Sequence, residues 1–299
     1  MITPAWLDRR EYPFASHYLA VAAGRMHYVD EGHGSPVVMV HGNPTWSFLY
    51  RDLIKRLRPR YRCIAPDQLG FGLSDKPWGW NYLPQLHAAN LEALIEDLEL
   101  RDITLVVQDW GGPIGLAYAV AHPEKIARLV ILNTWAWPVN RDPYYLAFSG
   151  FVGGPLGRFL IRRFNFFARG IMPMAFGDKR KLTPAAHAQY LYPLADPRDR
   201  TGCLVFPKQI VGASPWLHAI WSNIGRLRDK PVQIVWGMQD IAFREQELRR
   251  WEATFPQARS LHLDGVGHYV QEEAPAELGA AVDAFLAETA PPPGPPGPV

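Results

Sequence analysis

The amino-acid sequence predicts an α/β fold in which a mostly parallel sheet, flanked by helices, is interrupted by an inserted helical cap. Short apolar runs, typical of strands buried on both faces, alternate with helical patterns in both halves of the chain. Between about 138 and 225 this alternation stops, and aromatic residues, proline and arginine dominate without a convincing strand. We therefore expect a core formed by residues 1–137 and 226–289, a cap over 138–225, and a disordered proline-rich tail over 290–299.

The first half of the chain predicts a hairpin followed by alternating strands and helices. Residues 16–22 and 25–30 alternate apolar and polar side chains around Ala23 and Gly24, which is typical of an antiparallel hairpin at a sheet edge. The patterns that follow predict, in chain order, a strand over 36–40, a helix over 47–57, a strand over 61–65, a helix over 82–98, a strand over 103–108, a helix over 113–121 and a strand over 126–133.

The same alternation returns after the cap. It predicts a strand over 231–237, a helix over 244–254, a strand over 259–263 and a last helix over about 275–287. Strands and helices in this order favour a parallel sheet, and the functional groups of such a sheet gather outside the carboxyl ends of its strands.

The composition argues against several classes of partner. With 31 basic and 29 acidic residues the net charge is +2, which gives no electrostatic reason to expect nucleic acid or a membrane. Cys63 and Cys203 lack the spacing of a metal or redox site and are expected to be buried free thiols. The N-terminus does not resemble a signal peptide, and no stretch approaches the roughly 18 apolar residues of a membrane helix. We expect a cytoplasmic protein.

Asp109 stands at the tip of a sharp turn between a strand and a helix. The apolar run 105–107 ends in Gln-Asp-Trp-Gly-Gly, and a helical pattern resumes at Ile114. Small residues around such a tip allow a strained backbone and a close approach of substrate. In the α/β-hydrolase elbow this position is usually the Ser of a G-x-S-x-G motif, which is absent from the chain. Asp109 could simply cap the helix, but the two glycines favour a carboxylate nucleophile.

Other polar residues also follow predicted strands. Beside Asp109 and Trp110 they are Asn43, Asp240 and His268, and the order nucleophile, acid, histidine is that of α/β-hydrolases. Alone, Asp240 could be a turn residue and His268 a loop histidine; their combination with Asp109 favours catalysis. His41 comes too early in the chain for this order, so we interpret it as structural support for its loop.

Four motifs together resemble the haloalkane dehalogenase family. They are His41-Gly42-Asn43-Pro44, Gln108-Asp109-Trp110-Gly111-Gly112, Trp236-Gly237-Met238-Gln239-Asp240 and Gly267-His268, and the likeness runs from about residue 15 to 288. Epoxide hydrolases share the Asp-Trp-Gly-Gly elbow, so Asn43 is the more specific mark. In one branch of the family a Glu after the sixth strand is the triad acid; predicted strand 126–133 is followed by no carboxylate, so the resemblance implies Asp240 as the acid. With Asn43 and Trp110 this pattern looks like the third subfamily.

The resemblance implies hydrolytic dehalogenation of a haloalkane to a primary alcohol and halide. Asp109 would displace the halide and form an alkyl ester, and His268, oriented by Asp240, would activate the hydrolytic water. The indole N–H of Trp110 and the amide of Asn43 would bind the halide, while the backbone N–H groups of both residues would form the oxyanion hole. The expected partners are a small apolar halogenated substrate and the halide product; no metal or organic cofactor is required. The oligomeric state stays open.

Two other functions compete with this interpretation. An epoxide hydrolase would use the same nucleophile and needs tyrosine hydroxyls as acids, for which the cap offers Tyr144, Tyr145, Tyr190 and Tyr192. A non-catalytic binding protein of the same fold is disfavoured because it has no need for the complete set of Asp109, Asp240 and His268. A fluoroacetate dehalogenase is also disfavoured, because that family carries Arg after the nucleophile to bind the substrate carboxylate, where this chain has Trp110.

Aromatic residues of the cap are candidates for the pocket wall. We name Phe148, Phe151, Phe164, Phe166 and Phe167 as possible lining residues. Trp135, Trp137 and Trp221 lie where one of them could add a halide contact.

Overall fold

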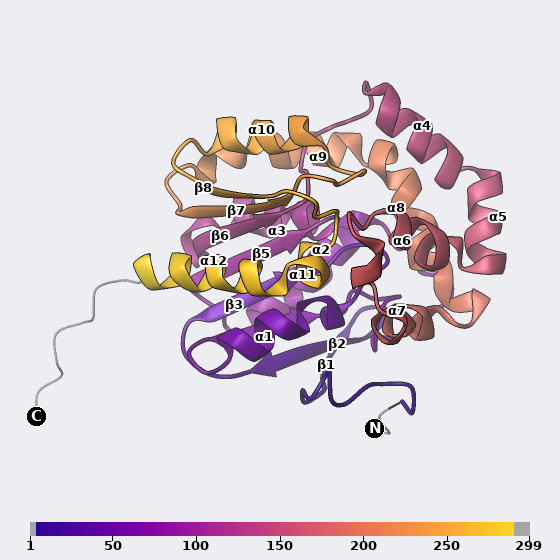
Figure 1. Ribbon diagram of the computed structural model, residues 1–299, viewed down its shortest axis with the longest axis horizontal. Helices are drawn as coiled ribbons and strands as arrows, with labels where there is room; N and C mark the ends of the chain where they lie inside the picture. Colours follow the sequence, from indigo (N-terminus) through magenta and orange to yellow (C-terminus); the bar gives the residue numbers. More distant parts are fainter. Residues whose placement is uncertain (1–3, 290–299) are drawn as a thin grey trace, which may run out of the picture.

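An eight-stranded sheet runs through the centre of the protein in the order β1-β2-β4-β3-β5-β6-β7-β8 (Figure 1). The structure is a computed structural model that describes residues 4–289; the predicted tail over 290–299 lies outside the described residues. The strands are β1 His17–Val21, β2 Gly24–Glu31, β3 Pro36–Val40, β4 Arg62–Pro66, β5 Ile103–Gln108, β6 Ile126–Leu132, β7 Val232–Gly237 and β8 Arg259–Leu263.

The sheet is parallel from β4 to β8, and its other edge is the predicted antiparallel hairpin of β1 and β2. The prediction of an α/β fold with a mostly parallel sheet is therefore confirmed. The fold matches the α/β-hydrolase arrangement because each parallel crossover carries a helix back across a face of the sheet.

Helices outside the segment 138–225 cover both faces of the sheet. The α-helices of the described chain are α1 Arg51–Leu57, α2 Pro84–Asp97, α3 Gly111–Ala121, α4 Pro143–Val152, α5 Pro155–Phe164, α6 Met172–Met174, α7 Pro184–Leu191, α8 Thr201–Gly212, α9 Ser214–Ser222, α10 Glu245–Thr254, α11 Val270–Glu273 and α12 Pro275–Glu288. In Figure 1, α1 and α12 lie in front of the sheet and α3 lies behind it.

Two cores result from the alternation of side chains along the strands. In β3, Val38 and Val40 face the core under α2 and α3, whereas Val37 and Met39 face the core under α1 and α12. A strand buried on both faces must be apolar at every position, which is why β3 reads as a continuous apolar run.

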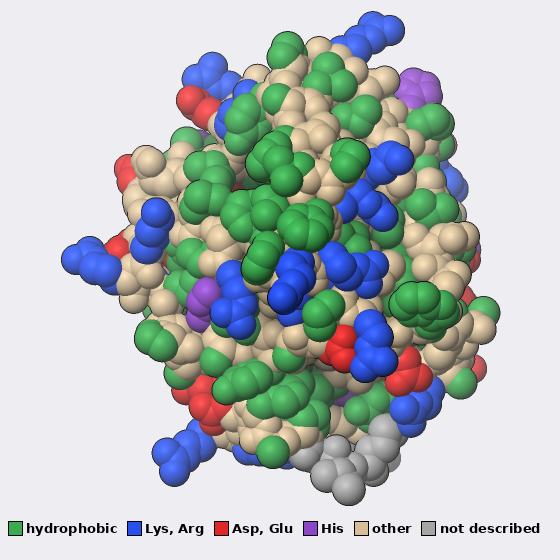
Figure 2. Space-filling model, turned by 90° about the vertical axis from the view of Figure 1, so that its right-hand side faces the viewer, with side chains coloured by type: hydrophobic (Ala, Val, Ile, Leu, Met, Phe, Trp, Pro, Cys, Tyr) green, Lys and Arg blue, Asp and Glu red, His purple; other side chains and the backbone are tan. Residues whose placement is uncertain are grey.

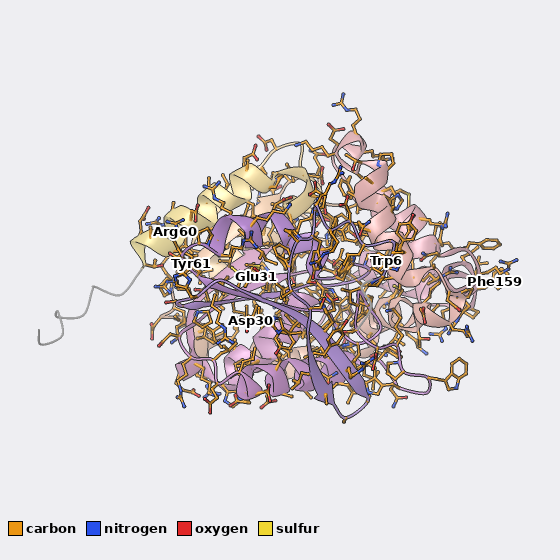
Figure 3. All side chains as sticks on the ribbon, turned by 90° about the horizontal axis from the view of Figure 1, so that it is seen from below. Trp6, Asp30, Glu31, Arg60, Tyr61 and Phe159 are labelled. Atoms are coloured by element: carbon orange, nitrogen blue, oxygen red, sulfur yellow. The ribbon has the colours of Figure 1, made fainter. Side chains whose placement is uncertain are left out.

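The predicted cap segment 138–225 leaves the sheet after β6 and returns to it at β7. Within it, the described elements from α4 to α9 are helical, as the sequence predicts. Helices α4 to α8 lie beyond one end of the sheet, whereas α9 returns toward the core and packs against α3 (Figure 1). Figure 3 shows Phe159 of α5 at this end and Arg60 and Tyr61 at the opposite end of the molecule.

Helix 47–57 differs from its prediction. Residues Ser47–Tyr50 form a 3₁₀ turn, and the α-helix begins only at Arg51. The backbone N–H of Ser47 donates to Oδ1 of Asp67 at 2.8 Å, which fixes the start of the turn against the loop after β4. Apolar spacing cannot distinguish the two kinds of helix because both place residues i and i+3 on one side. Between residues 4 and 289, no helix has both the length and the apolar character to cross a membrane.

Candidate active site

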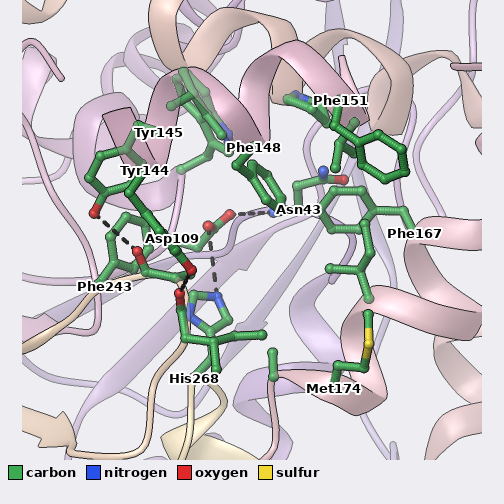
Figure 4. A pocket seen from close by; sticks show the side chains of 18 of the residues that line it. Asn43, Asp109, Tyr144, Tyr145, Phe148, Phe151, Phe167, Met174, Phe243 and His268 are labelled. Atoms are coloured by element: carbon green, nitrogen blue, oxygen red, sulfur yellow. Dashed lines mark hydrogen bonds and ion pairs between the residues drawn. The ribbon is translucent and has the colours of Figure 1, made fainter. Parts of the chain in front are cut away.

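An apolar cavity of about 310 Å³ lies between the carboxyl ends of the strands and the cap segment (Figure 4). Asn43, Asp109, Trp110 and His268 line it, so four of the five predicted site residues meet there. The fifth, Asp240, lies behind the ring of His268. The remaining wall is mostly aromatic and aliphatic, and such surroundings strengthen the electrostatic interactions of the few polar groups.

The turn after β5 holds Asp109 in a strained backbone conformation. Its φ is +50°, in the left-handed region that residues with a side chain rarely adopt. Two features stabilise this conformation. The N–H of Asp109 donates to the carbonyl of Asn133 at 3.0 Å, and Gly111, two residues later, allows a close approach of the backbone of Val40. A Cβ at Gly111 would stand 1.9 Å from the carbonyl oxygen of Val40, so only glycine fits there. The elbow expected from the sequence is present.

The carboxylate of Asp109 is hydrogen-bonded on one side and open on the other. The backbone N–H of Asn43 donates to Oδ1 at 2.7 Å, and the backbone N–H of Trp110 also donates to the carboxylate. The second oxygen, Oδ2, lies 3.7 Å from Nε2 of His268. The amide of Asn43 therefore holds Oδ1, the amide of Trp110 is a second donor to the carboxylate, and Oδ2 lies on the histidine side of the pocket.

His268 and Asp240 form a buried pair. Nδ1 of His268 lies 2.9 Å from Oδ2 of Asp240, and the backbone N–H of His268 donates to the carbonyl of Ala175 at 2.8 Å. This arrangement places the Nδ1 proton on the Asp240 side, so Nε2 carries the lone pair that faces Asp109. The carboxylate of Asp240 also accepts the N–H of Ala242 at 2.6 Å.

Burial and charge shift the pKa of both groups that face each other. Burial raises the pKa of the Asp109 carboxyl above its ordinary value, and His268 and the two backbone amides offset this only in part. Burial alone would lower the pKa of His268, but the Asp240 carboxylate outweighs it, with help from Asp109, and the pKa is raised. For His268 the raised pKa reflects stabilisation of the imidazolium by Asp240, whereas for Asp109 burial opposes the charged form and the two backbone amides and His268 support it.

Asn133 hydrogen-bonds Asp240, a role that its position in the sequence did not reveal. Its Nδ2 donates to Oδ2 of Asp240 at 2.8 Å and to the carbonyl of Gly237 at 3.1 Å, and its Oδ1 accepts the N–H of Gly237 at 2.8 Å. The side chain thus joins the end of β6 to the end of β7. The pattern after β6 indicated only that no carboxylate stands there, whereas an amide facing the next strand could have been suspected as a partner for one.

Gln108 is a second site residue that sequence reasoning missed. Its Nε2 lies 2.8 Å from Nε2 of His268 and 3.2 Å from the carbonyl oxygen of the same residue. The amide therefore donates to the lone pair that a catalytic base would use. Gln108 ends β5, and a polar side chain at the end of a strand that is buried throughout is the signal that could have indicated its role.

The side chains of Asn43 and Trp110 meet the pocket on the other side of Asp109. Within residues 4–289 the side-chain oxygen of Asn43 is buried without a hydrogen-bond partner, and its amide nitrogen and the indole N–H of Trp110 also make no hydrogen bond. The Trp110 ring stacks on Phe206 at 4.9 Å and contacts Trp135 edge-on at 4.7 Å. Two donors without protein partners, one of them on a fixed ring, suit a small anion.

Most of the predicted lining aromatics reach the pocket. Phe148, Phe151, Phe166 and Phe167 line it, but Phe164 does not and is exposed on the end of α5. Of the three tryptophans named as possible halide contacts, only Trp135 lines the cavity.

Trp137 and Trp221 lie elsewhere. Both pack against Trp251, and Arg250 stacks over their rings. Their sequence positions, in or next to the cap segment, could not reveal that their rings point toward α10.

The four tyrosines considered for epoxide opening have other partners. Tyr144 and Tyr145 line the pocket, but their hydroxyls donate to the carbonyls of Ile241 and Ala242. The hydroxyl of Tyr190 donates to Glu272, and Tyr192 stacks on Trp6. No pair of free phenol protons faces Asp109 in the part of the chain that the structure describes.

His41 lies between two loops. Its Nε2 accepts the N–H of Gln68 at 2.8 Å, and Nδ1 bonds the carbonyl of Gly42 at 2.8 Å. Burial lowers the pKa of His41, so the neutral ring with one donor and one acceptor fits both contacts. Among residues 4–289, no group of three His, Cys, Asp or Glu side chains is placed to hold a metal ion.

Comparison with known proteins gives a consistent result. The family model for the alpha/beta hydrolase fold matches residues 35–275. Haloalkane dehalogenase 2 of Mycobacterium tuberculosis is 40% identical over 277 residues, covering 92% of this chain and 96% of that protein. The cis-3-alkyl-4-alkyloxetan-2-one decarboxylase of Shewanella oneidensis is 38% identical, covering 93% and 90%. The crystal structure of a haloalkane dehalogenase from Bradyrhizobium elkani superposes with a TM-score of 0.84 at 25% identity, covering 92% and 98%.

Proposed function

The chain belongs to the haloalkane dehalogenase family of the α/β-hydrolase fold, and from that premise we propose that it hydrolyses a haloalkane to a primary alcohol and halide through an ester on Asp109. The observation that carries the proposal is the asymmetry of this carboxylate. Oδ1 accepts a backbone hydrogen bond at 2.7 Å, while Oδ2 lies 3.7 Å from Nε2 of His268 in an apolar pocket. A carboxylate in this position needs no base to become a nucleophile.

In the first step Oδ2 of Asp109 attacks the carbon that bears the halogen. The new C–O bond forms as the C–halogen bond breaks, and the halide leaves with the bonding electron pair. Asn43 and Trp110 supply neutral N–H donors for the leaving anion, which stabilise it without a counter-charge that would hold it in the pocket. The apolar wall brings the substrate to the nucleophile and keeps bulk water from competing.

In the second step water attacks Cγ of the ester. Nε2 of His268 takes the water proton, and Asp240 stabilises the imidazolium that forms. The negative charge of the tetrahedral intermediate would develop on Oδ1, to which the N–H of Asn43 already donates, and the N–H of Trp110, a second donor to this carboxylate, would help to stabilise it. The Cγ–O(alkyl) bond then breaks, and His268 returns the proton to the departing alcohol.

We also propose the third subfamily for this chain. The support is the set of Asn43, Trp110 and Asp240 together with Asn133, an amide where another branch carries a Glu acid. Asn133 donates to Asp240 at 2.8 Å, so β6 contributes a partner for the acid in place of the acid itself.

A single turnover in ¹⁸O-labelled water tests the mechanism. The alcohol oxygen comes from Asp109 and the water oxygen enters the carboxylate, so we expect unlabelled alcohol and a labelled peptide containing Asp109. The measurement is mass spectrometry of both products with a brominated alkane as substrate. Labelled alcohol and unlabelled protein would mean direct attack by water and would exclude the ester.

The variant His268→Phe separates the two steps. Displacement can proceed without a base, but hydrolysis cannot, so we expect a stoichiometric burst of halide and an alkyl adduct on Asp109. Asp109→Asn is the matched control, in which neither burst nor adduct should form. A His268→Phe protein that stays free of adduct with a substrate of the wild type would contradict the assignment of Asp109.

The relatives named cis-3-alkyl-4-alkyloxetan-2-one decarboxylases give this site a second candidate reaction. A substrate with two alkyl chains needs an extended apolar wall around the nucleophile. The pocket offers such a wall through Phe148 and Phe151 of α4 and through Phe167 and Met174 of the segment after α5. Oδ2 of Asp109 would displace the ring oxygen at C4 as it displaces a halide. Loss of CO₂ from C3 would then form the C3=C4 double bond and release Asp109, so the reaction consumes no water.

Gas chromatography distinguishes the two candidates. Wild-type protein is given a cis-dialkyl oxetanone and, separately, a brominated alkane, while alkene, CO₂ and bromide are followed. Alkene formation that Asp109→Asn abolishes would support the second candidate, and bromide release with no alkene would remove it.

A further inference from the structure

The charges of this protein are segregated between the cap segment and the rest of the chain. Residues 138–225 carry 11 Lys and Arg against 4 Asp, a net charge of +7, whereas all other residues carry 20 basic and 25 acidic side chains, a net charge of −5. The sum is the +2 of the whole chain. The overall balance therefore conceals a strongly basic segment.

The same end of the molecule exposes large apolar side chains around the pocket. Tyr144, Phe151, Met174 and Ile241 line the cavity and are also exposed. Farther out, the exposed apolar side chains continue with Leu146, Leu156, Phe159 and Phe164. We call these eight residues, with the cations around them, the cap face. Four of its exposed apolar residues thus also form part of the pocket wall.

Phe159 and Phe164 lie on α5 and project from the protein. Their side chains are 57% and 54% exposed and contact each other edge-on at 6.1 Å. Figure 3 shows Phe159 pointing outward at the extreme end of the molecule. Exposed aromatic pairs of this kind are costly in water and commonly mark an interaction surface.

Cations lie among these apolar side chains. Arg158, Arg163, Arg169 and Lys208 belong to α5, α8 and the segment after α5, and none has an ion-pair partner within residues 4–289. The guanidinium of Arg163 stacks at 5.5 Å on Phe164. In Figure 2, which views this end of the protein, Lys and Arg side chains form a band across hydrophobic surface.

We propose that the cap face docks on the surface of an anionic lipid membrane. Aromatic and aliphatic side chains at the level of the lipid headgroups, interleaved with unpaired Arg and Lys, are the two attractions that hold an interfacial helix. A second copy of the chain fits less well, because two segments of net charge +7 would face each other. The pocket opens on the docked side, so an apolar substrate would enter it from the lipid. Docking itself does not depend on the proposed reaction.

Co-sedimentation with vesicles tests the proposal. The full-length protein is mixed with phosphatidylcholine vesicles that contain roughly a third phosphatidylglycerol, and with pure phosphatidylcholine vesicles. We expect binding to the anionic vesicles that weakens as salt is raised and much weaker binding to the neutral ones.

Two double variants separate the contributions. Each cation near an anionic surface changes the partition coefficient about fivefold, so Arg158→Glu with Arg163→Glu should weaken binding by about 25-fold or more. Phe159→Ser with Phe164→Ser should weaken binding even at high salt. Trp78→Ser and Arg249→Glu, at exposed positions outside the cap segment, are the matched controls and should leave binding unchanged.

Several outcomes would overturn docking. They are no binding to anionic vesicles, equal binding to both vesicle types, or binding that the two double variants leave intact. Light scattering is run in parallel: a dimer that Phe159→Ser with Phe164→Ser dissociates would assign the face to a second copy. Turnover of a water-soluble bromoalkane, expected to be unchanged in all variants, shows that they are folded. If the wild type turns over no haloalkane, circular dichroism replaces this check and the vesicle result still decides.

Discussion

His268 accepts a hydrogen bond from Gln108 at Nε2, the nitrogen that would take the proton from water in the proposed hydrolysis. A hydrogen bond donated to the neutral ring favours that form and therefore lowers the pKa of the histidine. The Asp240 carboxylate acts in the opposite direction. The basicity of His268 thus depends on burial, on the neighbouring carboxylates and on the Gln108 contact at Nε2. In the proposed hydrolysis, the water that is activated would take the place of the Gln108 amide.

Gln108→Met removes the contact at Nε2 with little change in volume. We expect the pKa of His268 to rise, so the decline of hydrolysis on the acid side should move to higher pH. The measurement is the pH dependence of kcat with a substrate whose ester hydrolysis limits turnover. A purely structural role would lower kcat at all pH values and leave the shape of the profile unchanged.

Trp110→Phe removes a proposed halide donor and keeps an aromatic ring on Phe206. A hydrogen bond to a charged group contributes about 1.5–3 kcal/mol, so bromide should inhibit roughly 10- to 100-fold more weakly. Product inhibition by added bromide measures this affinity. Trp137→Phe is the matched control, because Trp137 does not line the cavity. Equal inhibition of both variants would contradict the assignment of Trp110.

The sequence predicted the groups that follow strands and missed those whose role depends on side-chain direction. Asp109, Asp240 and His268 come together because parallel strands end at one edge of the sheet. Gln108 and Asn133 bear on catalysis only through what their amides face across neighbouring strands, and spacing along one strand does not carry that information.

Strands were predicted closely because their apolar runs have sharp ends. β5 and β8 have the predicted bounds, and β3 does too. Helices were predicted less closely at their ends, since the apolar period continues into residues that cap or lead into the helix. α2 begins at Pro84, two residues after the predicted start, because proline favours the first turn of a helix.

A buried ion pair joins three helices beside the site. The guanidinium of Arg51 in α1 pairs with Glu272 in α11, with Nη2 and Oε2 2.8 Å apart, and the hydroxyl of Tyr190 in α7 donates to the same carboxylate. Glu272 lies four residues after His268, so this contact connects the cap segment and α1 to the loop that holds the histidine.

Arg51→Met should destabilise the protein by about 3–5 kcal/mol, because it leaves the Glu272 carboxylate buried without its cation. Urea unfolding followed by circular dichroism measures the loss. The double variant Arg51→Met with Glu272→Gln removes both charges and should recover part of the stability. No recovery in the double variant would mean that Arg51 stabilises through packing alone.

The charges of the whole molecule predict loss of stability in acid. Among residues 4–289, carboxyl groups with a lowered pKa outnumber those with a raised pKa. The carboxyl groups with a lowered pKa are those of Asp67, Asp75, Glu96, Asp142, Asp178, Asp196, Glu252 and Glu288. Those with a raised pKa are Asp109, Asp199 and Glu273. A lowered pKa in the folded state contributes stability above the unfolded value, and this contribution is lost as pH falls through the folded pKa.

We therefore expect Tm to fall as pH decreases below about 4, because buried carboxylates with a lowered pKa, such as Asp67 beside His27, become protonated. Asp178 and Asp196, whose pKa is lowered to about 2, contribute less because solvent screens their ion pairs. Calorimetry over this range measures the change. A Tm that stays constant down to about pH 3 would contradict the expectation. The composition predicted no such trend, because a net charge of +2 averages over groups whose surroundings differ.

β6 and β7 are neighbours in the sheet, paired from Leu129 with Val232 to Leu132 with Val235, although nearly a hundred residues separate them along the chain. The cap segment therefore leaves and re-enters the core at adjacent points. Its length and sequence can change while the strand pairing stays the same, and Asn43, Asp109, Asp240 and His268 all lie outside it. Natural variation can thus exchange the substrate range and the docking surface of this enzyme while its bond-breaking chemistry is inherited intact.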